Sequence, residues 1–179
     1  MRKYLLPALL LMSCKQKLNT LPKDHSYQDT AIFYELMDSA NNTLRRDSSL
    51  PEKIVAFAKT QIGVPYKYCS MSPDGGFDCS GFVNYVFNHF NISVPRSSVE
   101  FTNIGEEIIL RNAQPGDLIL FTGTNARKRI VGHIGIIIAN DNGEISFIQS
   151  SSGAVYSVVV SPLDKYYMSR FVKVIRIIK

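Results

Sequence analysis

The chain of 179 residues is long enough for one domain and a short leader. Hydrophobic residues make up 45% of it and charged residues 20%, a balance that supports a buried core and excludes general disorder. The formal net charge of +5 suits contact with an acidic polymer or with anionic lipid. The sequence lacks the dense stripe of lysine and arginine that is typical of nucleic-acid-binding proteins, so we expect no nucleic-acid partner.

The first residues have the pattern of an export signal. Arg2 and Lys3 give a positive start, residues 5–12 form an apolar run, and the small Ser13 precedes Cys14. The run is too short to span a bilayer. Its end is similar to a lipobox, the site at which bacterial lipoproteins are cleaved and the new N-terminal cysteine is acylated. An ordinary secretory signal with an incidental cysteine is the alternative.

This leader predicts an exported protein that is anchored to a membrane. We expect residues 1–13 to be a lipoprotein signal peptide and Cys14 to carry the lipid, with the domain facing the periplasm or the cell exterior. The membrane is then a partner through the N-terminal lipid. Residues 14–47 are expected to form a tether, within which residues 27–44 have the apolar spacing of a helix.

Residues 48–179 are the predicted folded domain. Ser49 and Glu52 form a capping-box pattern before one predicted helix, and Asp78 is the predicted N-cap of a second, strongly amphipathic helix. A shorter helix is expected over residues 97–104. Five later runs are rich in β-forming residues, namely residues 118–121, 134–139, 145–150, 155–160 and 171–178. Helices followed by antiparallel strands indicate an α+β fold.

Cys79 has the surroundings of a nucleophile, and the alternative is a buried cysteine that acts as a small hydrophobe. It lies at the predicted N-terminus of the second helix, where N–H groups and the helix dipole favour a thiolate and could bind an oxyanion. Asp78 fixes the first helical turn, and the small residues Ser80 and Gly81 leave room for a substrate backbone. Cys79 is therefore the candidate nucleophile.

A cysteine nucleophile needs a base, and the chain has only three histidines. His25 lies in the expected tether. His89 is on the same predicted helix as Cys79, and at about 100° per residue it points well away from the thiol. His133 remains, in a predicted strand between glycines that clear space around it. His133 is the candidate base, and an ordinary strand histidine is the alternative.

A hairpin predicted at residues 140–143 offers a partner for this base. If the turn is centred on Asp141, His133 and Gln149 face each other across adjacent strands, with Cβ atoms about 5 Å apart. Gln149 could then accept a hydrogen bond from one imidazole nitrogen and aim the other at Cys79. A slip of one residue would put Gln149 on the other face, as an ordinary polar residue of the strand.

Several short motifs occur in a specific order along the chain. They are Pro65-Tyr66-Lys67-Tyr68, the Ser-Pro-Asp-Gly-Gly turn, Asp78-Cys79-Ser80-Gly81-Phe82-Val83, Pro95-Arg96, Pro115-Gly116-Asp117-Leu118, Gly132-His133-Ile134-Gly135 and Phe147-Ile148-Gln149-Ser150. This order resembles that of the NlpC-type cell-wall cysteine peptidases. The resemblance implies a papain-like fold, with N-terminal helices packed on a five- to six-stranded antiparallel sheet. It also implies cleavage of D-γ-glutamyl-diamino-acid bonds in peptidoglycan stem peptides.

The resemblance also assigns roles to single residues. Cys79 and His133 match the family's nucleophile and base, and Gln149 falls where a third polar residue, often histidine, is found. Tyr66 matches a tyrosine that lines the active site, where its hydroxyl could bind substrate or thiolate; simple packing is the alternative. Cys69 stands where such enzymes usually carry glycine, so a positive φ there would strain it. Cys69 could form a disulfide with Cys79 or be a buried free thiol.

Three functions stay open from the sequence. The first is a peptidoglycan endopeptidase that works by acyl transfer, with Asp78, Ser80 and Tyr66 beside the substrate. The second is an amidase or acyltransferase that acts on another γ-glutamyl or lipid amide. The third is a catalytically silent lipoprotein that binds the cell wall. The sequence has no clustered set of His, Asp and Glu ligands, so we expect no metal and no other cofactor.

Overall fold

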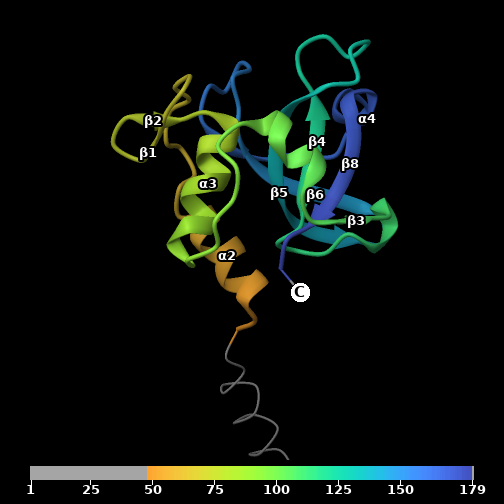
Figure 1. Cartoon of the computed structure of the whole chain (residues 1–179), viewed down its shortest axis with the longest axis horizontal. Helices are drawn as coiled ribbons and strands as arrows, with labels where there is room; N and C mark the ends of the chain where they lie inside the picture. Colours follow the sequence, from red (N-terminus) through yellow and green to blue (C-terminus); the bar gives the residue numbers. More distant parts are fainter. Residues whose placement is uncertain (1–47, 179) are drawn as a thin grey trace, which may run out of the picture. The chain divides into compact units, whose positions relative to one another are not determined.

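The computed structural model describes residues 48–178 of the chain. The expected signal peptide, the acylation site Cys14 and the expected tether all fall in residues 1–47, outside the described part, and they stay predictions. The described residues form an α+β domain in which helices lie beside an antiparallel sheet, as Figure 1 shows. No helix within residues 48–178 is both long enough and apolar enough to cross a bilayer.

Helix α2, Leu50–Lys59, begins at the predicted capping box. The main-chain N–H of Ser49 donates to the Glu52 carboxylate at 2.7 Å, and the Ser49 hydroxyl accepts from the main-chain N–H of Glu52 at 3.5 Å. Ile54 and Ala58, one turn apart, are fully buried. The helix therefore presents one apolar face to the core, as its sequence period predicts.

Helix α3, Cys79–His89, starts one residue after its predicted N-cap. The Asp78 carboxylate accepts a hydrogen bond from the main-chain N–H of Gly81 at 2.7 Å, which satisfies one of the helix's end donors. Phe82, Val83, Val86 and Phe87 on this helix are fully buried. The cap and the apolar face together fix Cys79 as the first helical residue.

The main sheet has six antiparallel strands in the order β3-β8-β4-β5-β6-β7. Its strands are β3 (Glu106–Ile108), β4 (Leu118–Thr122), β5 (Val131–Asp141), β6 (Glu144–Ser150), β7 (Val158–Pro162) and β8 (Phe171–Arg176). A separate hairpin of two short strands, β1 (Met71–Ser72) and β2 (Gly76–Phe77), precedes α3. Figure 1 shows α2 and α3 together on one side of the main sheet.

Two apolar cores lie on the two faces of the sheet. The core beneath α2 and α3 includes the fully buried side chains Phe82, Phe87, Leu118, Leu120, Ile134 and Ile148. The core on the other face includes Ile119, Phe121, Ile137, Phe147 and Val174. Because successive side chains of a strand point to opposite faces, His133, which pairs with Phe121, belongs to the second face.

The predicted hairpin turn is present between β5 and β6. Asn142 and Gly143 form a two-residue connection with positive φ values of 55° and 99°, which suits asparagine and glycine. Asp141 pairs with Glu144 across it. The turn is therefore centred after Asn142, and the predicted centre on Asp141 is wrong.

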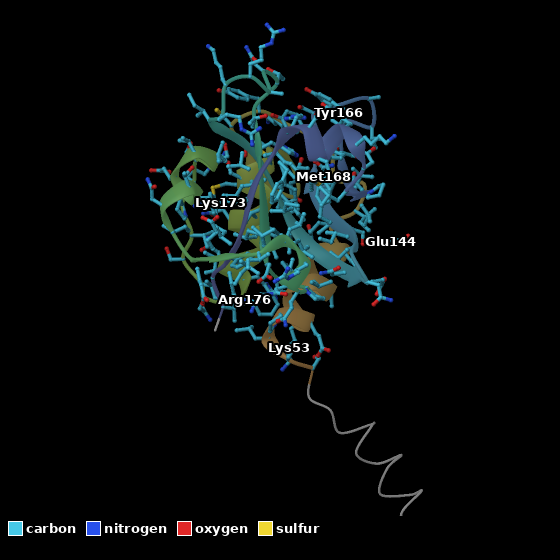
Figure 2. The ribbon with its side chains drawn as sticks, turned by 90° about the vertical axis from the view of Figure 1, so that its right-hand side faces the viewer. Lys53, Glu144, Tyr166, Met168, Lys173 and Arg176 are labelled. Carbon is cyan, nitrogen blue, oxygen red and sulfur yellow. The ribbon has the colours of Figure 1, made fainter. Side chains whose placement is uncertain are left out.

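Some elements differ from the predicted pattern. The helix expected over residues 97–104 is a 3-10 helix, Ser98–Asn103, and strand β7 starts later than predicted, at Val158. Strand β3 and helix α4, Lys165–Arg170, had no periodic signal because each is too short to show one. Figure 2 shows α4, with Tyr166 and Met168, toward one end of the sheet and Arg176 toward the other.

Candidate active site

Cys79 sits where the first turn of α3 meets strand β5. Main-chain hydrogen bonding to its thiol comes from Ser80, from Ile134 and from Cys79 itself, and each of these lowers the pKa of the thiol. Ile134 directly follows His133 in β5. The sulfur therefore lies beside the main chain that carries the candidate base.

The net pKa of Cys79 is nevertheless raised. Burial is the largest cause, because it disfavours the charged thiolate, and the negative charge of Asp78 is the next. These two effects outweigh the main-chain hydrogen bonds. The sequence-based expectation that the helix terminus favours a thiolate holds for the N–H groups but is wrong for the thiol as a whole.

Gly81, two residues after Cys79, is required by packing against another segment of chain. A Cβ atom on Gly81 would lie 2.1 Å from the main-chain oxygen of Ser70, so this position admits glycine because another segment of chain crosses it. The same Ser70 oxygen accepts a hydrogen bond from the Asp78 N–H at 2.9 Å. The expected role of Gly81, room for a substrate backbone, is therefore wrong: neighbouring main chain fills this space.

Asp78 has a second partner besides its helix. Arg96 donates to both carboxylate oxygens of Asp78, at 2.9 and 2.5 Å, and also to the Ser80 hydroxyl at 3.1 Å. The hydrogen bond to Asp78 raises the pKa of Arg96. This two-point ion pair holds the first turn of α3 against the segment after the helix. The buried hydroxyl of Ser80 is thereby directed toward the ion pair.

His133 and Gln149 are joined by a hydrogen bond, as predicted, although they do not pair directly. The imidazole Nε2–H donates to the side-chain oxygen Oε1 of Gln149. A register shift between Ile137 and Ala139 inserts one extra residue into β5, after which Ile136 pairs with Ile148. Continuing that register makes His133 a diagonal neighbour of Gln149, two residues from the position directly opposite it.

This β-bulge decides which face the pair shares. With the turn centred after Asn142, an unbroken ladder would put His133 and Gln149 on opposite faces of the sheet, since side chains alternate. The one extra residue in β5 returns both side chains to the same face. The predicted contact is therefore confirmed, but through a turn and a bulge that compensate each other.

The amide of Gln149 is held from its other end. Its nitrogen Nε2 donates to the Ser161 hydroxyl at 2.8 Å and to the Tyr167 hydroxyl at 2.5 Å. With both N–H donors used, the amide oxygen faces the imidazole and accepts the Nε2–H of His133. The neutral ring then carries its proton on Nε2, and Nδ1 is its basic nitrogen.

Burial lowers the pKa of His133 to about 4. The hydrogen bond to Gln149 raises the pKa in part, and the positive charge of Arg170 lowers it further. The imidazole is therefore neutral at neutral pH. Together with the raised pKa of Cys79, this leaves both the thiol and the ring uncharged in the free protein.

The glycines beside His133 admit neighbouring groups. A Cβ atom on Gly132 would lie 2.7 Å from the Cα of Gly123, and one on Gly135 would lie 2.7 Å from a ring carbon of Phe147. Gly132 thus lets the two ends of the β4–β5 loop meet, and Gly135 makes room for Phe147. The prediction that these glycines clear space for the histidine is wrong, because they make room for Gly123 and Phe147 instead.

The structure joins His133 to Gln149 but does not join Cys79 to His133 by a hydrogen bond within residues 48–178. The two candidates line neighbouring cavities on either side of the start of β5. One cavity, of about 410 Å³, contains Cys79 and is bounded by Gly132. The other, of about 540 Å³, contains His133 and Gln149. The start of β5, with Gly132 and His133, therefore separates the two cavities.

Tyr66 and Cys69 both line the cavity of Cys79. The pKa of Tyr66 is raised, first by burial and then by the thiol of Cys79 and the carboxylate of Asp78, so its hydroxyl stays protonated. Cys69 is exposed and has a φ of 56°, the positive value that the usual glycine at this place suggests. The expectation of a buried thiol at Cys69 is wrong, and both cysteines are free.

Four residues at the site had no role in the sequence-based prediction. Arg96 was quoted only within a motif, and the two hydroxyls that hold Gln149, on Ser161 and Tyr167, belong to segments without a chemical pattern. Arg170 ends the short helix α4. None of these could be found locally, because each acts through a partner distant in sequence. The described residues also contain no group of three or more His, Cys, Asp or Glu side chains suited to a metal ion.

Comparisons with known proteins identify relatives of this chain. The model of the NlpC/P60 family matches residues 63–176. Gamma-DL-glutamyl hydrolase of Bacillus subtilis is 37% identical over 115 residues, which are 64% of this chain and 26% of that protein. The bifunctional muramidase/DL-endopeptidase CwlT of the same organism is 32% identical over 135 residues, or 75% of this chain and 40% of that protein.

A solved structure gives the same result at the level of the fold. The crystal structure of an NlpC/P60 family protein from Bacillus cereus has a TM-score of 0.63 and 28% identity, and the match covers 72% of this chain and 40% of that one. The chain thus spans less than half the length of these relatives. Because the family model matches well over half of the sequence, the chain belongs to the NlpC/P60 family.

Proposed function

We propose that this protein is a cysteine endopeptidase that cleaves D-γ-glutamyl-diamino-acid bonds in the stem peptides of peptidoglycan. One observation carries the proposal: the thiol of Cys79, at the start of α3, lies against the main chain next to His133, whose ring is held by Gln149. The names of two relatives, a gamma-DL-glutamyl hydrolase and a DL-endopeptidase, support this bond type.

The proposed reaction requires the ring of His133 to reach the sulfur of Cys79, to which no hydrogen bond joins it among the described residues, and it starts with both groups uncharged. Nδ1 of His133 takes the proton of Cys79 as the thiolate attacks the peptide carbonyl, so the charges develop together in the transition state. A preformed thiolate–imidazolium pair is disfavoured, because the pKa of the thiol is raised and that of the imidazole is lowered. The proton on Nε2 stays on the ring throughout, hydrogen-bonded to Gln149. This keeps the ring in the tautomer that accepts a proton at Nδ1.

The first turn of α3 serves the oxyanion. The main-chain N–H groups of Cys79 and Ser80, which lower the pKa of the thiol, can donate to the carbonyl oxygen as it becomes negative. His133 then gives its new proton to the leaving amine, and an acyl group stays on Cys79. Water attacks that thioester with His133 again as base, and the thiol is released with its proton.

The cavity of Cys79 suits the acyl half of the substrate. Tyr66, with its protonated hydroxyl, and the Asp78–Arg96 pair line this cavity together with Ser80. A protonated phenol can donate a hydrogen bond to a substrate oxygen, and the small Ser80 leaves the entrance to the sulfur open. We assign Tyr66, Asp78 and Ser80 to substrate binding on these grounds.

The proposal includes export and attachment to a membrane through lipid on Cys14. It rests on the leader pattern of residues 1–14 alone. Intact mass spectrometry of the protein purified from bacterial membranes tests it: an acylated N-terminus at Cys14 is expected, and a Cys14→Ser variant should leave the membrane fraction. A mature protein that starts elsewhere, without lipid, would contradict the anchor.

Defined substrates test the reaction. We expect cleavage of L-alanyl-γ-D-glutamyl-diaminopimelate at the γ-glutamyl bond, with one new amine for each acyl product. Turnover of another γ-glutamyl amide or of a lipid amide, without cleavage of this peptide, would favour the amidase or acyltransferase reading. Loss of all turnover, while wall fragments still bind, would favour a silent wall-binding protein. Cys79→Ala is the matched control for each substrate.

A further inference from the structure

The second cavity beside the candidate site, here called the Arg170 pocket, has a volume of about 540 Å³. It is lined by His133, Gln149, Val159, Ser161, Tyr167 and Arg170, among other residues. It thus contains the candidate base, the amide that holds it and both hydroxyls that hold the amide. Figure 2 shows Tyr166, which also lines the pocket, on α4 at the end of the sheet from which the β4–β5 loop projects.

Arg170 is the one charged side chain among the described residues that line this pocket, if His133 is neutral. One terminal nitrogen donates to the main-chain oxygen of Thr122 at 2.8 Å and the other to the Tyr166 hydroxyl at 2.7 Å. Both partners are uncharged, and Nε is buried without a hydrogen-bond partner among the described residues. The guanidinium therefore brings a positive charge that no carboxylate of residues 48–178 balances at hydrogen-bond distance.

The cavity of Cys79 is the opposite case. Its arginine, Arg96, is bound at two points by the carboxylate of Asp78. Its positive charge is therefore already compensated within the protein, whereas that of Arg170 is not. Of the two cavities, only the Arg170 pocket offers an unbalanced guanidinium to a ligand, and a carboxylate fits the fork of a guanidinium with two parallel hydrogen bonds.

The direction of the proposed reaction decides which half of the substrate reaches this pocket. The carbonyl must lie at Cys79, and the leaving amine must lie at the ring of His133, which protonates it. The chain that continues from the amine therefore runs past His133, away from the cavity of Cys79. The Arg170 pocket is the space on that side of the ring.

We propose that the Arg170 pocket binds the amine-side half of the substrate and that Arg170 recognises a carboxylate on that half. This proposal rests on the proposed function. It adds a carboxylate on the amine-side half, which the type of bond cleaved does not specify. The diamino acid that leaves with the amine carries such a carboxylate close to the bond that is cut. Arg170 then makes the enzyme prefer substrates in which this carboxyl group is free over those in which it is an amide.

Two matched peptides test the pocket. They are L-alanyl-γ-D-glutamyl-L-lysine with a free C-terminal carboxylate and the same peptide with a C-terminal carboxamide. Wild-type protein should cleave the carboxylate form with a kcat/KM roughly ten- to a hundredfold higher, the usual range for a hydrogen bond to a charged group. Arg170→Gln should bring this ratio close to one. Arg127→Gln, which removes an equal charge from an exposed loop outside the pocket, should keep the wild-type ratio.

Binding to the Cys79→Ala variant separates this proposal from the proposed function. Calorimetry of the two peptides should give the same preference for the carboxylate, and the double variant Cys79→Ala/Arg170→Gln should lose it. If neither peptide is cut but the binding preference is present, the proposed reaction fails and the pocket assignment stands. Equal cleavage and equal binding of the two forms by wild-type and Arg170→Gln protein would overturn the pocket assignment and leave the reaction intact.

Discussion

Nε2 of His133 donates its proton to Oε1 of Gln149, whose own amide nitrogen is held by the hydroxyls of Ser161 and Tyr167. A catalytic imidazole often has a carboxylate or a second histidine as its partner. In this protein the partner is a neutral amide. A neutral partner orients the ring without the electrostatic attraction that would raise the pKa of the histidine. Burial therefore keeps the pKa of His133 low, at about 4, and the hydrogen bond to Gln149 raises it only in part.

The pH profile of the wild-type protein follows from that pKa. A base works only when it is neutral, so the acid side of the kcat/KM profile should lie near pH 4, where His133 becomes protonated. An ordinary histidine would lose activity between about pH 6 and 7. Initial rates measured from pH 3.5 to 8, on protein that circular dichroism finds folded throughout, check this. An acid side at or above pH 6.5 would contradict the uncharged resting pair.

Gln149→Glu should move this profile. The carboxylate would accept the same hydrogen bond from Nε2 and attract the positive imidazolium, so the pKa of His133 should rise and the acid side should shift to higher pH by about one unit or more. The hydroxyls of Ser161 and Tyr167 can turn and donate to the new carboxylate. Gln114→Glu adds the same charge at an exposed position outside both cavities and is the control. An unchanged profile in Gln149→Glu would mean that the two side chains do not meet in the working enzyme.

Tyr167→Phe tests the hydrogen bond from the Gln149 amide nitrogen to the Tyr167 hydroxyl. Without the phenol, one of the two amide N–H donors loses its acceptor, at a cost of about 1 kcal/mol, and kcat should fall roughly fivefold with little change in KM. Tyr167→Phe with Ser161→Ala should lower kcat further, because the amide is then free to turn. The ¹⁵N chemical shifts of His133 report the tautomer directly, and a ring that keeps its proton on Nε2 in the double variant would contradict this role.

Asp78→Asn should make Cys79 more reactive. Asparagine keeps the helix cap but removes the negative charge, which is the second cause of the raised pKa of the thiol, and it leaves the positive Arg96 without its partner. The rate of alkylation by iodoacetamide at pH 7, followed by mass spectrometry of the Cys79 peptide, should therefore increase severalfold.

Asp117→Asn is the matched control for this experiment. Asp117 forms a similar two-point pair with Arg176, at 2.7 and 2.8 Å, outside the cavity of Cys79. Its replacement should leave the alkylation rate of Cys79 as in the wild type. A slower reaction in Asp78→Asn would show that the carboxylate acts on the thiol by geometry rather than by charge. Because Cys79 is protonated in the resting protein, slow alkylation of wild-type protein does not by itself indicate a silent domain.

Local patterns were enough to predict helices α2 and α3 and most strands. Ser49 and Asp78 act on N–H groups within three residues, so their caps are visible in the sequence, and the nucleophile follows from the second cap. Helix α4 and strand β3 are too short for a period, and each contributes one partly buried side chain, Tyr167 and Ile108, to the second core. The family resemblance supplied what the local patterns could not, namely the six-stranded papain-like arrangement.

The site was predictable in its members but not in its electrostatics. His133 follows by elimination, and its contact with Gln149 was expected from the hairpin, yet the register needed a bulge at Ile138 that no residue type announces. The direction of the Cys79 pKa depends on burial and on Asp78 in three dimensions, so the helix terminus alone gave the wrong sign. Arg170 is far from His133 in the sequence, and only the folded structure brings the two into the same cavity.

The proposed function requires Cys79 to attack the γ-glutamyl carbonyl of cell-wall peptides. Mass spectrometry of purified peptidoglycan after incubation with wild-type protein and with Cys79→Ala tests this step. The wild type should release fragments that end in a free γ-carboxyl of D-glutamate and matching fragments with a new diamino-acid amine, and Cys79→Ala should release neither. The same fragments at the same rate from Cys79→Ala would contradict this step.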